Sequence, residues 1–320
     1  MTVQRNSQEV SRPVSGVELP VRLGITTPVL TLLPGGHAPW EASGGIDEVA
    51  TIARAAEALG YDHLTCSEHV IVPTQVALTR GSRYWDPLAT FGYLAAVTSR
   101  IRLATNVLVL GYHHPLEIAK RYGTLDQVAA GRLILGLGVG SLEEEFDLLG
   151  VPFADRGARA DDAVSALRAS LSTNRPTYDG PYYHYADVVL DPCARQSTVP
   201  LWIGGRTARS LRRAVELGDG WVPFSIKAVD VRAMIDEART TPAWTARTRP
   251  LEVVLRNGRP LDPLDDPDGT RIVLRRLTGA GATGLQLWFV HRSLDHYLEQ
   301  LGAMAALALE LGVDDDPPDR

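Results

Sequence analysis

Two stretches of this sequence carry residue types that could do chemistry, and each follows a short apolar run. His69 comes three residues after the run 63–66, and an imidazole in that position can take up or release a proton near neutral pH. The segment GGRT at 204–207 follows the run 201–203 and opens a helical pattern, so backbone N–H groups, the helix dipole and a guanidinium converge there. These stretches predict proton transfer and phosphate binding. The plain alternatives are a histidine bonded to backbone and a tight turn without a ligand.

A third stretch, LGLGVG at 135–140, contains three alternating glycines. It could be taken for the dinucleotide fingerprint of an open, doubly wound sheet, but the glycines do not have the GxGxxG spacing. No clear acidic partner ends the next strand. Alternating glycines on a barrel strand would instead let a flat molecule lie close to the backbone.

Metal and disulfide chemistry are not indicated by the sequence. The two cysteines, Cys66 and Cys193, lie far apart and form no CxxC or Cys/His pattern, which fits a reducing compartment. His113 and His114 are adjacent at the start of a helical segment and so point in different directions. We expect no metal site.

A regular alternation of short apolar runs and helical segments must position these residues. Eight runs predict strands at 21–29, 63–66, 101–110, 133–139, 201–203, 221–224, 251–255 and 285–290. Eight segments with helical spacing follow them at 47–59, 87–98, 115–128, 159–171, 208–217, 229–240, 270–278 and 293–311. Eight strand-helix units close most economically into a parallel barrel without sheet edges, so the predicted fold is α/β, a single (β/α)8 TIM barrel. The alternative is the open doubly wound sheet.

Residues that begin and end helices mark several of these boundaries. Asp47 and Ser293 are residue types that cap helix N-termini, and we expect each to begin a helix. Gly60, Gly218 and Gly312 follow helical segments, and we expect them to end those helices.

Length and charge limit the classes of partner. The chain has 320 residues with 45% hydrophobic and 22% charged residues, which is ordinary for a globular protein and allows one large barrel or two domains. It carries 32 Lys and Arg against 38 Asp and Glu, a net charge of −6. This balance argues against nucleic acid as the main partner and favours a small-molecule substrate.

The two ends of the chain are polar. Residues 1–20 contain no hydrophobic signal region and no run long enough to span a membrane, so we expect a flexible arm and a cytoplasmic protein. Residues 313–320 are rich in aspartate and proline and are expected to form a flexible acidic tail. The barrel is expected to occupy residues 21–312.

Two long, turn-rich segments interrupt the strand-helix pattern and are expected as insertions over the C-terminal mouth. Segment 173–199 contains several prolines and tyrosines and is too long for a simple connection, which predicts a hairpin excursion or lid. Its Tyr182, Tyr183 and Tyr185 could roof a substrate, or simply pack beneath the loop. Segment 256–269 could form a second loop over the barrel mouth.

Four strings carry a resemblance to a known family. They are AEALGYDHLTCSEHV at 56–70, WDPLATFGYLAAVTSRIRLATNVLVL at 85–110, TLDQVAAGRLILGLGVGSLEEEFDLLG at 124–150 and PLWIGGRTARSLRRAVELGDGWVP at 200–223. Together they resemble the luciferase-like monooxygenase superfamily, in particular its branch that uses the deazaflavin coenzyme F420. The resemblance covers roughly residues 21–311, in the order of the predicted strands.

The resemblance implies roles for residues at the second and third strands. His69, in an SEH motif, is implied to stand beside the flavin-like ring and to donate or accept the proton. Glu68, where relatives usually carry Asp, is implied to contact the cofactor. Asn106 and Val107 align with a position where relatives have a non-prolyl cis peptide against one face of the deazaflavin; an ordinary buried strand is the alternative. Val109 lies on the same strand face and could line the cofactor's tail.

Later motifs are implied to hold the rest of the cofactor. Val139, Gly140 and Glu144 match positions that contact the deazaflavin and its ribityl chain, although residues 143–145 could simply be a solvated helix start. Ser141 stands where sugar-phosphate-oxidising relatives carry a catalytic glutamate, which argues against that substrate.

The double-glycine segment completes the implied cofactor site. In the family it holds the phosphodiester of the cofactor tail, which implies Gly204, Gly205 and Thr207 as contacts.

The function implied by the resemblance is hydride transfer between coenzyme F420 and a small organic substrate. The barrel would supply orientation and exclude water, while the cofactor would carry the chemistry. Two alternatives remain: an FMN-dependent monooxygenase on the same scaffold, and a non-catalytic relative that binds a ligand. Relatives are commonly homodimers, so we expect one here.

Overall fold

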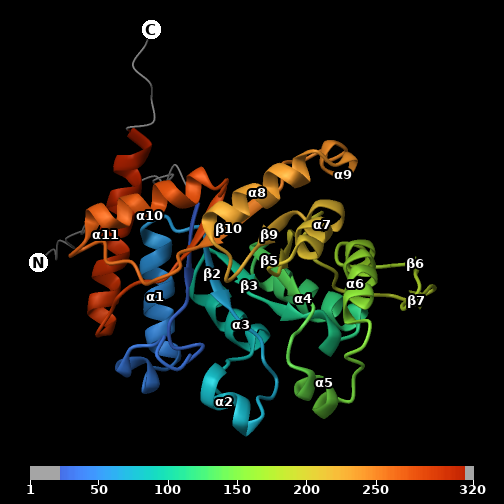
Figure 1. Cartoon of the computed structure of the whole chain (residues 1–320). Coiled ribbons are helices and arrows are strands. Elements are labelled where there is room, and N and C mark those ends of the chain that lie inside the picture. Colours follow the sequence, from blue (N-terminus) through green and yellow to red (C-terminus); the bar gives the residue numbers. More distant parts are fainter. Residues whose placement is uncertain (1–21, 314–320) are drawn as a thin grey trace, which may run out of the picture.

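Parallel strands close into a barrel in the computed structural model, which describes residues 22–313 (Figure 1). The sheet order is β3-β2-β1-β11-β10-β9-β8-β5-β4, and pairing of β3 with β5 closes the ring. The barrel strands are β1 (Arg22–Thr26), β2 (His63–Cys66), β3 (Arg102–Thr105), β4 (Leu108–Val109), β5 (Leu133–Gly138), β8 (Leu201–Gly204), β9 (Gly220–Val222), β10 (Glu252–Arg256) and β11 (Gly284–Leu287). Counting β3 and β4 as one position, the eight-stranded (β/α)8 barrel is confirmed.

Helices surround the barrel on its outer face (Figure 1). All eight predicted helices are present: α1 (Ile46–Ala58), α3 (Pro87–Val97), α4 (Pro115–Val128), α6 (Arg156–Ser170), α7 (Ala208–Leu217), α8 (Ala228–Arg239), α10 (Pro267–Gly279) and α11 (Leu294–Val313). Three short helices were not predicted: α2 (Thr74–Arg80), α5 (Glu143–Leu149) and α9 (Pro242–Thr245). Within the described part of the chain, no helix is both long and apolar enough to cross a membrane.

The helix ends agree with the predicted boundaries in part. Ser293 does begin α11, since its hydroxyl accepts the backbone N–H of His296 at 3.1 Å. The expectation for Asp47 is wrong: α1 begins one residue earlier, and Glu48 reaches back to the N–H of Gly45 at 2.7 Å. Gly218 caps α7 as predicted. Gly312 does not stop α11, which continues to Val313.

The predicted ends of the chain are only partly covered by the structure. The arm at 1–20 lies outside the described residues, as does the tail from 314 onward.

The third predicted strand is broken where a single strand was expected. β3 and β4 are separated by the Asn106-Val107 peptide, which is cis. Two 3-10 turns, η1 (Pro39–Ala42) and η2 (Leu110–Tyr112), lie in loops at the carboxyl end of the barrel. The broken strand places Asn106 and Val107 at the carboxyl end of the barrel.

Alternation along the strands fills the barrel interior. Ala104, Ile134, Trp202, Val222 and Val254 come from five neighbouring strands and form one buried cluster, separate from the larger core between strands and helices. Ala104 stands directly beside Ile134 in the register of β3 and β5, so a small and a large side chain share one layer.

Segment 173–199 forms the predicted hairpin, with strands β6 (Tyr178–Asp179) and β7 (His184–Tyr185) paired antiparallel. Its anchor is Asp162 on α6, which accepts the Tyr178 hydroxyl at 2.5 Å and the backbone N–H groups of Tyr182 and Tyr183. The hairpin therefore lies on the outside of α6 (Figure 1). Its tyrosines do not roof the cavity at the barrel mouth: Tyr182 packs on Arg159, Tyr183 on His114, and Tyr185 bonds to Ser170.

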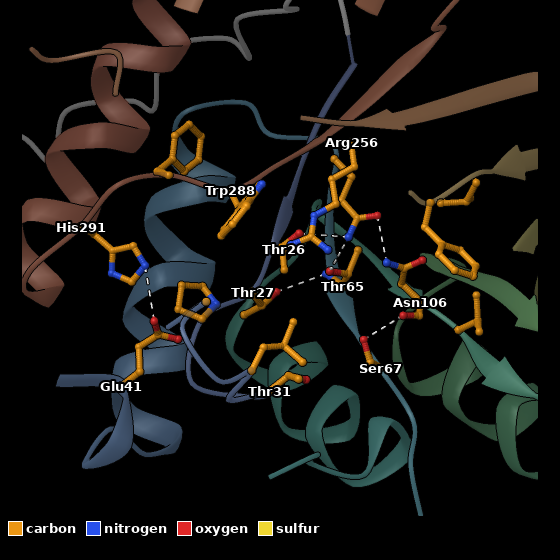
Figure 2. A pocket seen from close by; sticks show the side chains of 18 of the residues that line it. Thr26, Thr27, Thr31, Glu41, Thr65, Ser67, Asn106, Arg256, Trp288 and His291 are labelled. Carbon is orange, nitrogen blue, oxygen red and sulfur yellow. Dashed lines mark hydrogen bonds and ion pairs between the residues drawn. The ribbon is translucent and has the colours of Figure 1, made fainter. Parts of the chain in front are cut away.

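The carboxyl ends of the strands open into a cavity of about 270 Å³ (Figure 2). The first residue of segment 256–269, Arg256, lines this cavity, and Leu261 pairs with Phe289 nearby. The segment thus begins at the barrel mouth, as predicted.

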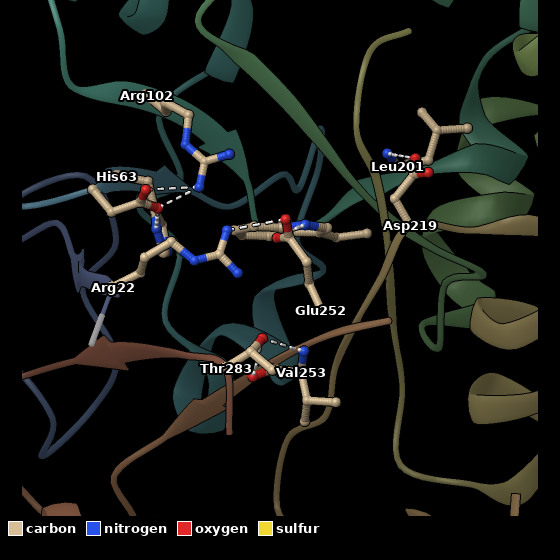
Figure 3. Close-up of polar contacts among 10 residues, drawn as sticks. Arg22, His63, Arg102, Leu201, Asp219, Glu252, Val253 and Thr283 are labelled. Atoms are coloured by element: carbon tan, nitrogen blue, oxygen red, sulfur yellow. Dashed lines mark hydrogen bonds and ion pairs between the residues drawn. The ribbon is translucent and has the colours of Figure 1, made fainter. Parts of the chain in front are cut away.

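The opposite end of the barrel is closed by a network of charged side chains (Figure 3). Asp62 accepts hydrogen bonds from His63 Nδ1 at 2.7 Å and from Arg102 at 2.6 Å. Glu252 binds Arg22 at 3.0 Å and the Trp202 indole N–H at 2.9 Å. Burial alone would raise the pKa of Asp62, but hydrogen bonds and charge from His63 and Arg102 hold it well below its ordinary value of 3.8.

Replacing Asp62 with Asn should lower the free energy of unfolding by about 1–3 kcal/mol at pH 7, because His63 and Arg102 would lose a charged acceptor. Because the folded-state pKa of Asp62 is depressed, its stabilisation is present above 3.8 and is lost as the pH falls below that value. Unfolding by guanidinium chloride should therefore show a smaller difference in unfolding free energy between Asp62→Asn and wild type in acid than at pH 7. The exposed Asp236→Asn should change little, and an equal loss in both variants would contradict the prediction.

Candidate active site

The cavity at the barrel mouth is built from the ends of six strand positions. Hydroxyl groups come from threonines and Ser67 at and after the ends of β1 and β2. Amides come from Asn106 and Gln286, and apolar side chains come from the segments after β9 and β11. The residues that line it are Thr26, Thr27, Pro28, Thr31, Leu33, Gly36, Glu41, Thr65, Ser67, Asn106, Val107, Val222, Pro223, Phe224, Arg256, Gln286, Trp288, Phe289, His291 and Tyr297. Catalytic residues of barrel enzymes lie at this end of the strands.

Asn106 and Val107 form one wall of the cavity, and they are the only two predicted site residues that line it. The Asn106 amide donates to Gln286 Oε1 at 3.0 Å, and its carbonyl accepts the Ser67 hydroxyl at 2.8 Å (Figure 2). Both bonds fix Asn106, on the N-terminal side of the cis peptide. Val107 lies against Gly138 and Gly204, where a β-carbon would come within 2.4 and 2.7 Å of its methyl groups.

Glu68 points away from the cavity and organises the loops around it. It is buried, and its two carboxylate oxygens accept the backbone N–H of Val109 and His113 Nε2, each at 2.7 Å. Although burial opposes it, this contact with Glu68 raises the pKa of His113. The structure therefore gives Glu68, Val109 and His113 a shared supporting position behind Val107.

His69 lies beside the cavity in a polar cluster whose centre is Glu145. His69 Nδ1 bonds to Glu145 Oε2 at 2.6 Å, and the same oxygen accepts the Tyr112 hydroxyl at 2.6 Å. The other oxygen accepts the backbone N–H groups of Val70 and Ile71. The ring of Tyr84 packs edge-on against His69 with centroids 4.5 Å apart. The imidazole is thereby fixed, and its Nε2 has no hydrogen-bond partner among the described residues.

Glu145, and not the predicted Glu144, is the carboxylate that contacts other candidate residues. Glu144 is exposed on α5 and makes no side-chain hydrogen bond within the described chain, whereas Glu145 is fully buried. Burial alone would raise the pKa of Glu145, but hydrogen bonds from His69, Tyr112 and backbone hold it below its ordinary value. The sequence signal that could have found it is Phe146: this apolar neighbour starts the buried face of α5.

Replacing Glu145 with Gln should lower kcat about 10- to 100-fold, because an amide cannot accept from all four donors and would release the fixed imidazole. Cofactor affinity should stay near the wild-type value, since Glu145 does not line the cavity. Turnover and cofactor titration together test this. Glu144→Gln is the matched control and should behave as wild type; equal losses in the two variants would refute a role for Glu145.

Val139 and Gly140 follow β5, and Gly140 lies against Phe146 and Val109. Gly140 has φ +79°, and a β-carbon there would meet Phe146 at 2.5 Å and Val109 at 2.9 Å. Phe146 in turn packs edge-on against Tyr112. Gly140 is therefore required for close packing beside the histidine cluster.

The double glycine opens the turn into α7. Gly205 has φ +137°, a conformation that suits glycine, and Thr207 caps the helix through the N–H of Ser210. The backbone N–H groups of Gly205 and Arg206 make no hydrogen bond within the described chain, and the turn is largely exposed. This is a geometry that can accept an anion.

All predicted site residues lie at one end of the barrel, but they do not share one hollow. Val107 connects the cavity to Gly204, while His69 does not line the cavity and bonds to Glu145. Sequence reasoning missed Arg256, Gln286, Glu41 and His291. Arg256 ends β10, so the rule that barrel sites lie at strand ends could have found it.

Comparisons with known proteins agree with this architecture. A family model described as luciferase-like monooxygenase matches residues 27–257. An uncharacterised protein of Mycobacterium tuberculosis is 29% identical over 273 residues, covering 80% of this chain and 93% of that protein. An F420-dependent glucose-6-phosphate dehydrogenase of Kineococcus radiotolerans is 32% identical over 190 residues, covering 58% of this chain and 54% of that protein. The structure of monooxygenase RslO1 from Streptomyces bottropensis superposes with TM-score 0.75 at 20% identity, covering 91% of this chain and 99% of that one.

Proposed function

Because the chain belongs to the luciferase-like monooxygenase family, we propose that it is an oxidoreductase that transfers a hydride between coenzyme F420 and a small organic substrate. The observation that carries this proposal is the contact of Val107, which lines the cavity, with Gly204, which opens the anion-suited turn. A cavity wall and an anion-binding turn in contact suit a planar ring with a phosphate-bearing tail. The similarity to an F420-dependent dehydrogenase supports the choice of cofactor.

The residues at the mouth fit such a cofactor. Val107 and Asn106 would face the ring, Gly140 would allow close backbone approach, and the free N–H groups of Gly205 and Arg206 would receive the phosphate. A bound deazaflavin would supply two-electron hydride chemistry without activating oxygen. The substrate of the dehydrogenase relative is not carried over, because Ser141 stands where we expect the catalytic glutamate of sugar-phosphate enzymes.

His69 is the proposed proton donor or acceptor. Its Nδ1 is engaged by Glu145, so the proton would be held or released at Nε2. The buried carboxylate of Glu145 would keep the ring orientation constant during transfer. Tyr84 limits the ring's rotation from the opposite side.

An FMN-dependent monooxygenase is the second candidate, favoured by the structural similarity to RslO1. The decisive experiment is titration of the purified protein with F420 and with FMN, followed by visible absorbance, and then turnover under anaerobic and aerobic conditions. We expect tighter binding of F420 and oxygen-independent turnover with small alcohol or carbonyl compounds. Tight FMN binding with oxygen-dependent turnover would replace our proposal by the second candidate.

A further inference from the structure

A guanidinium without a partner points into the cavity. Arg256 ends β10, and Figure 2 shows its side chain directed into the cavity, on the side away from Glu41 and His291. Its guanidinium makes no hydrogen bond and no ion pair with any residue from 22 to 313. The guanidinium makes a cation–π contact with the Trp288 ring, whose centroid lies 5.0 Å from the guanidinium carbon.

Other arginines of the barrel wall all have partners. Arg22 binds Glu252, Arg102 binds Asp62, and the buried Arg132 donates to Thr98 and to four backbone carbonyls. Burial lowers the pKa of Arg256, yet a guanidinium stays charged in proteins. A half-buried charge without a partner is costly, so its place at a cavity indicates that a ligand completes it.

The charge distribution in the cavity matches one negative charge. Among its lining residues Arg256 is the only arginine or lysine, and the only carboxylate is Glu41. Glu41 is occupied by the backbone N–H groups of Val29 and Ala38 and lies at the other side. Burial lowers the pKa of the adjacent His291 to about 4, so that side supplies a neutral imidazole. A phosphate dianion would be only half neutralised by Arg256.

The size of the cavity and the shape of the free guanidinium edge limit the class of ligand further. The cavity has a volume of about 270 Å³, and the proposed function places the cofactor's ring against its Asn106 and Val107 wall, which leaves room for a small ligand only. Trp288 supports one face of the guanidinium and leaves its N–H edge free, and that planar edge matches a carboxylate in bidentate geometry.

We propose that Arg256 binds the carboxylate of the substrate, so that the substrate is a small organic acid with a single negative charge. This rests on the proposed function, in which the cofactor's ring faces Asn106 and Val107 and the substrate occupies the part of the cavity beside Arg256. Gln286 stands beside Arg256 in the register of β10 and β11 and accepts from the Asn106 amide, and these two amides complete the polar side of the cavity. Arg256 is thus the residue that determines specificity for acids.

The test is titration of the cofactor-free protein with benzoate, the neutral analogue benzamide and phenyl phosphate, followed by calorimetry and tryptophan fluorescence. Wild type should bind benzoate at least tenfold more tightly than either analogue. Arg256→Gln should weaken benzoate binding about 10- to 100-fold. Arg259→Gln, an exposed arginine on the same loop, should bind benzoate as wild type does.

Two further measurements distinguish a role of Arg256 in binding the substrate's carboxylate from a structural role and from a role in binding the cofactor. If Arg256 serves the ligand, Arg256→Gln should unfold at the same temperature as wild type or higher, because an uncompensated charge is removed; a lower midpoint would indicate a structural role and overturn the proposal. F420 affinity should be unchanged in Arg256→Gln, and a parallel loss would assign Arg256 to the cofactor. Absence of benzoate binding to wild type, or tighter binding of phenyl phosphate, would also overturn it. Because no turnover is measured, failure of the F420 proposal leaves this result interpretable.

Discussion

Replacing His69 with Ala should lower turnover about 10²- to 10⁴-fold while leaving the cofactor bound with nearly wild-type affinity. The physical reason is that Nε2 is the free atom of an imidazole whose Nδ1 is held at 2.6 Å by a buried carboxylate. Removing the ring removes the proton carrier and leaves Val107, Gly204 and the turn before α7 intact. The measurement is the steady-state change in deazaflavin absorbance with the substrate found in the anaerobic screen.

The matched control for this variant is His184→Ala, which removes an exposed imidazole from the β6–β7 hairpin and should change nothing. His69→Gln should be nearly as inactive as His69→Ala, because glutamine occupies similar space but does not titrate. Full activity in His69→Ala would eliminate His69 as the proton carrier. A wild-type protein that binds F420 without turnover on any substrate would instead favour the non-catalytic alternative.

Replacing Gly136 with Ala should destabilise the barrel by about 3 kcal/mol and lower Tm by roughly 5 °C or more. A β-carbon at Gly136 would lie 1.9 Å from the carbonyl oxygen of Thr105, and that oxygen belongs to backbone that cannot rotate away. Thr105 precedes Asn106, so the same clash should displace the cavity wall and weaken cofactor binding. Thermal unfolding and cofactor titration measure the two effects.

Gly92→Ala is the matched control for this prediction. Gly92 lies within α3, and a β-carbon there would meet no atom within 4 Å. Alanine should therefore raise the free energy of unfolding by about 0.5–1 kcal/mol, because it restricts the unfolded chain and favours the helix. A Gly136→Ala protein as stable as wild type would mean that β3 and β5 can separate at this position.

The spacing of apolar residues along the sequence was sufficient to predict the barrel fold. Each predicted strand is present because its apolar residues are buried, as in the run LILGLG of β5, where all six residues are inaccessible. The helices α4 and α7 have the predicted bounds, since Pro115 and Thr207 begin them by local chemistry. Such signals depend on near neighbours in the chain and can be recognised from sequence.

The candidate site was predicted less completely. The resemblance identified the strands that carry it, including His69 and the Asn106-Val107 peptide, which the structure shows to be cis. It implied Glu144 as a cofactor contact, and it did not point to the neighbouring Glu145, because three consecutive carboxylates cannot be told apart until a helix face is assigned. Only the packing of Phe146 against Tyr112 turns Glu145 inward to His69.

What the sequence by itself determined is therefore the order of strands and helices and the end of the barrel at which chemistry occurs. What only the tertiary structure decided is which side chains meet there: Glu145 with His69, Glu68 with His113, and Arg256 with the Trp288 ring but with no hydrogen-bond or ion-pair partner among the described residues. The physical reason is that the hydrogen-bonding partners are separated along the chain by 76 residues in the first pair and by 45 in the second. Local propensity carries no information about such contacts, which arise when the ring of strands closes.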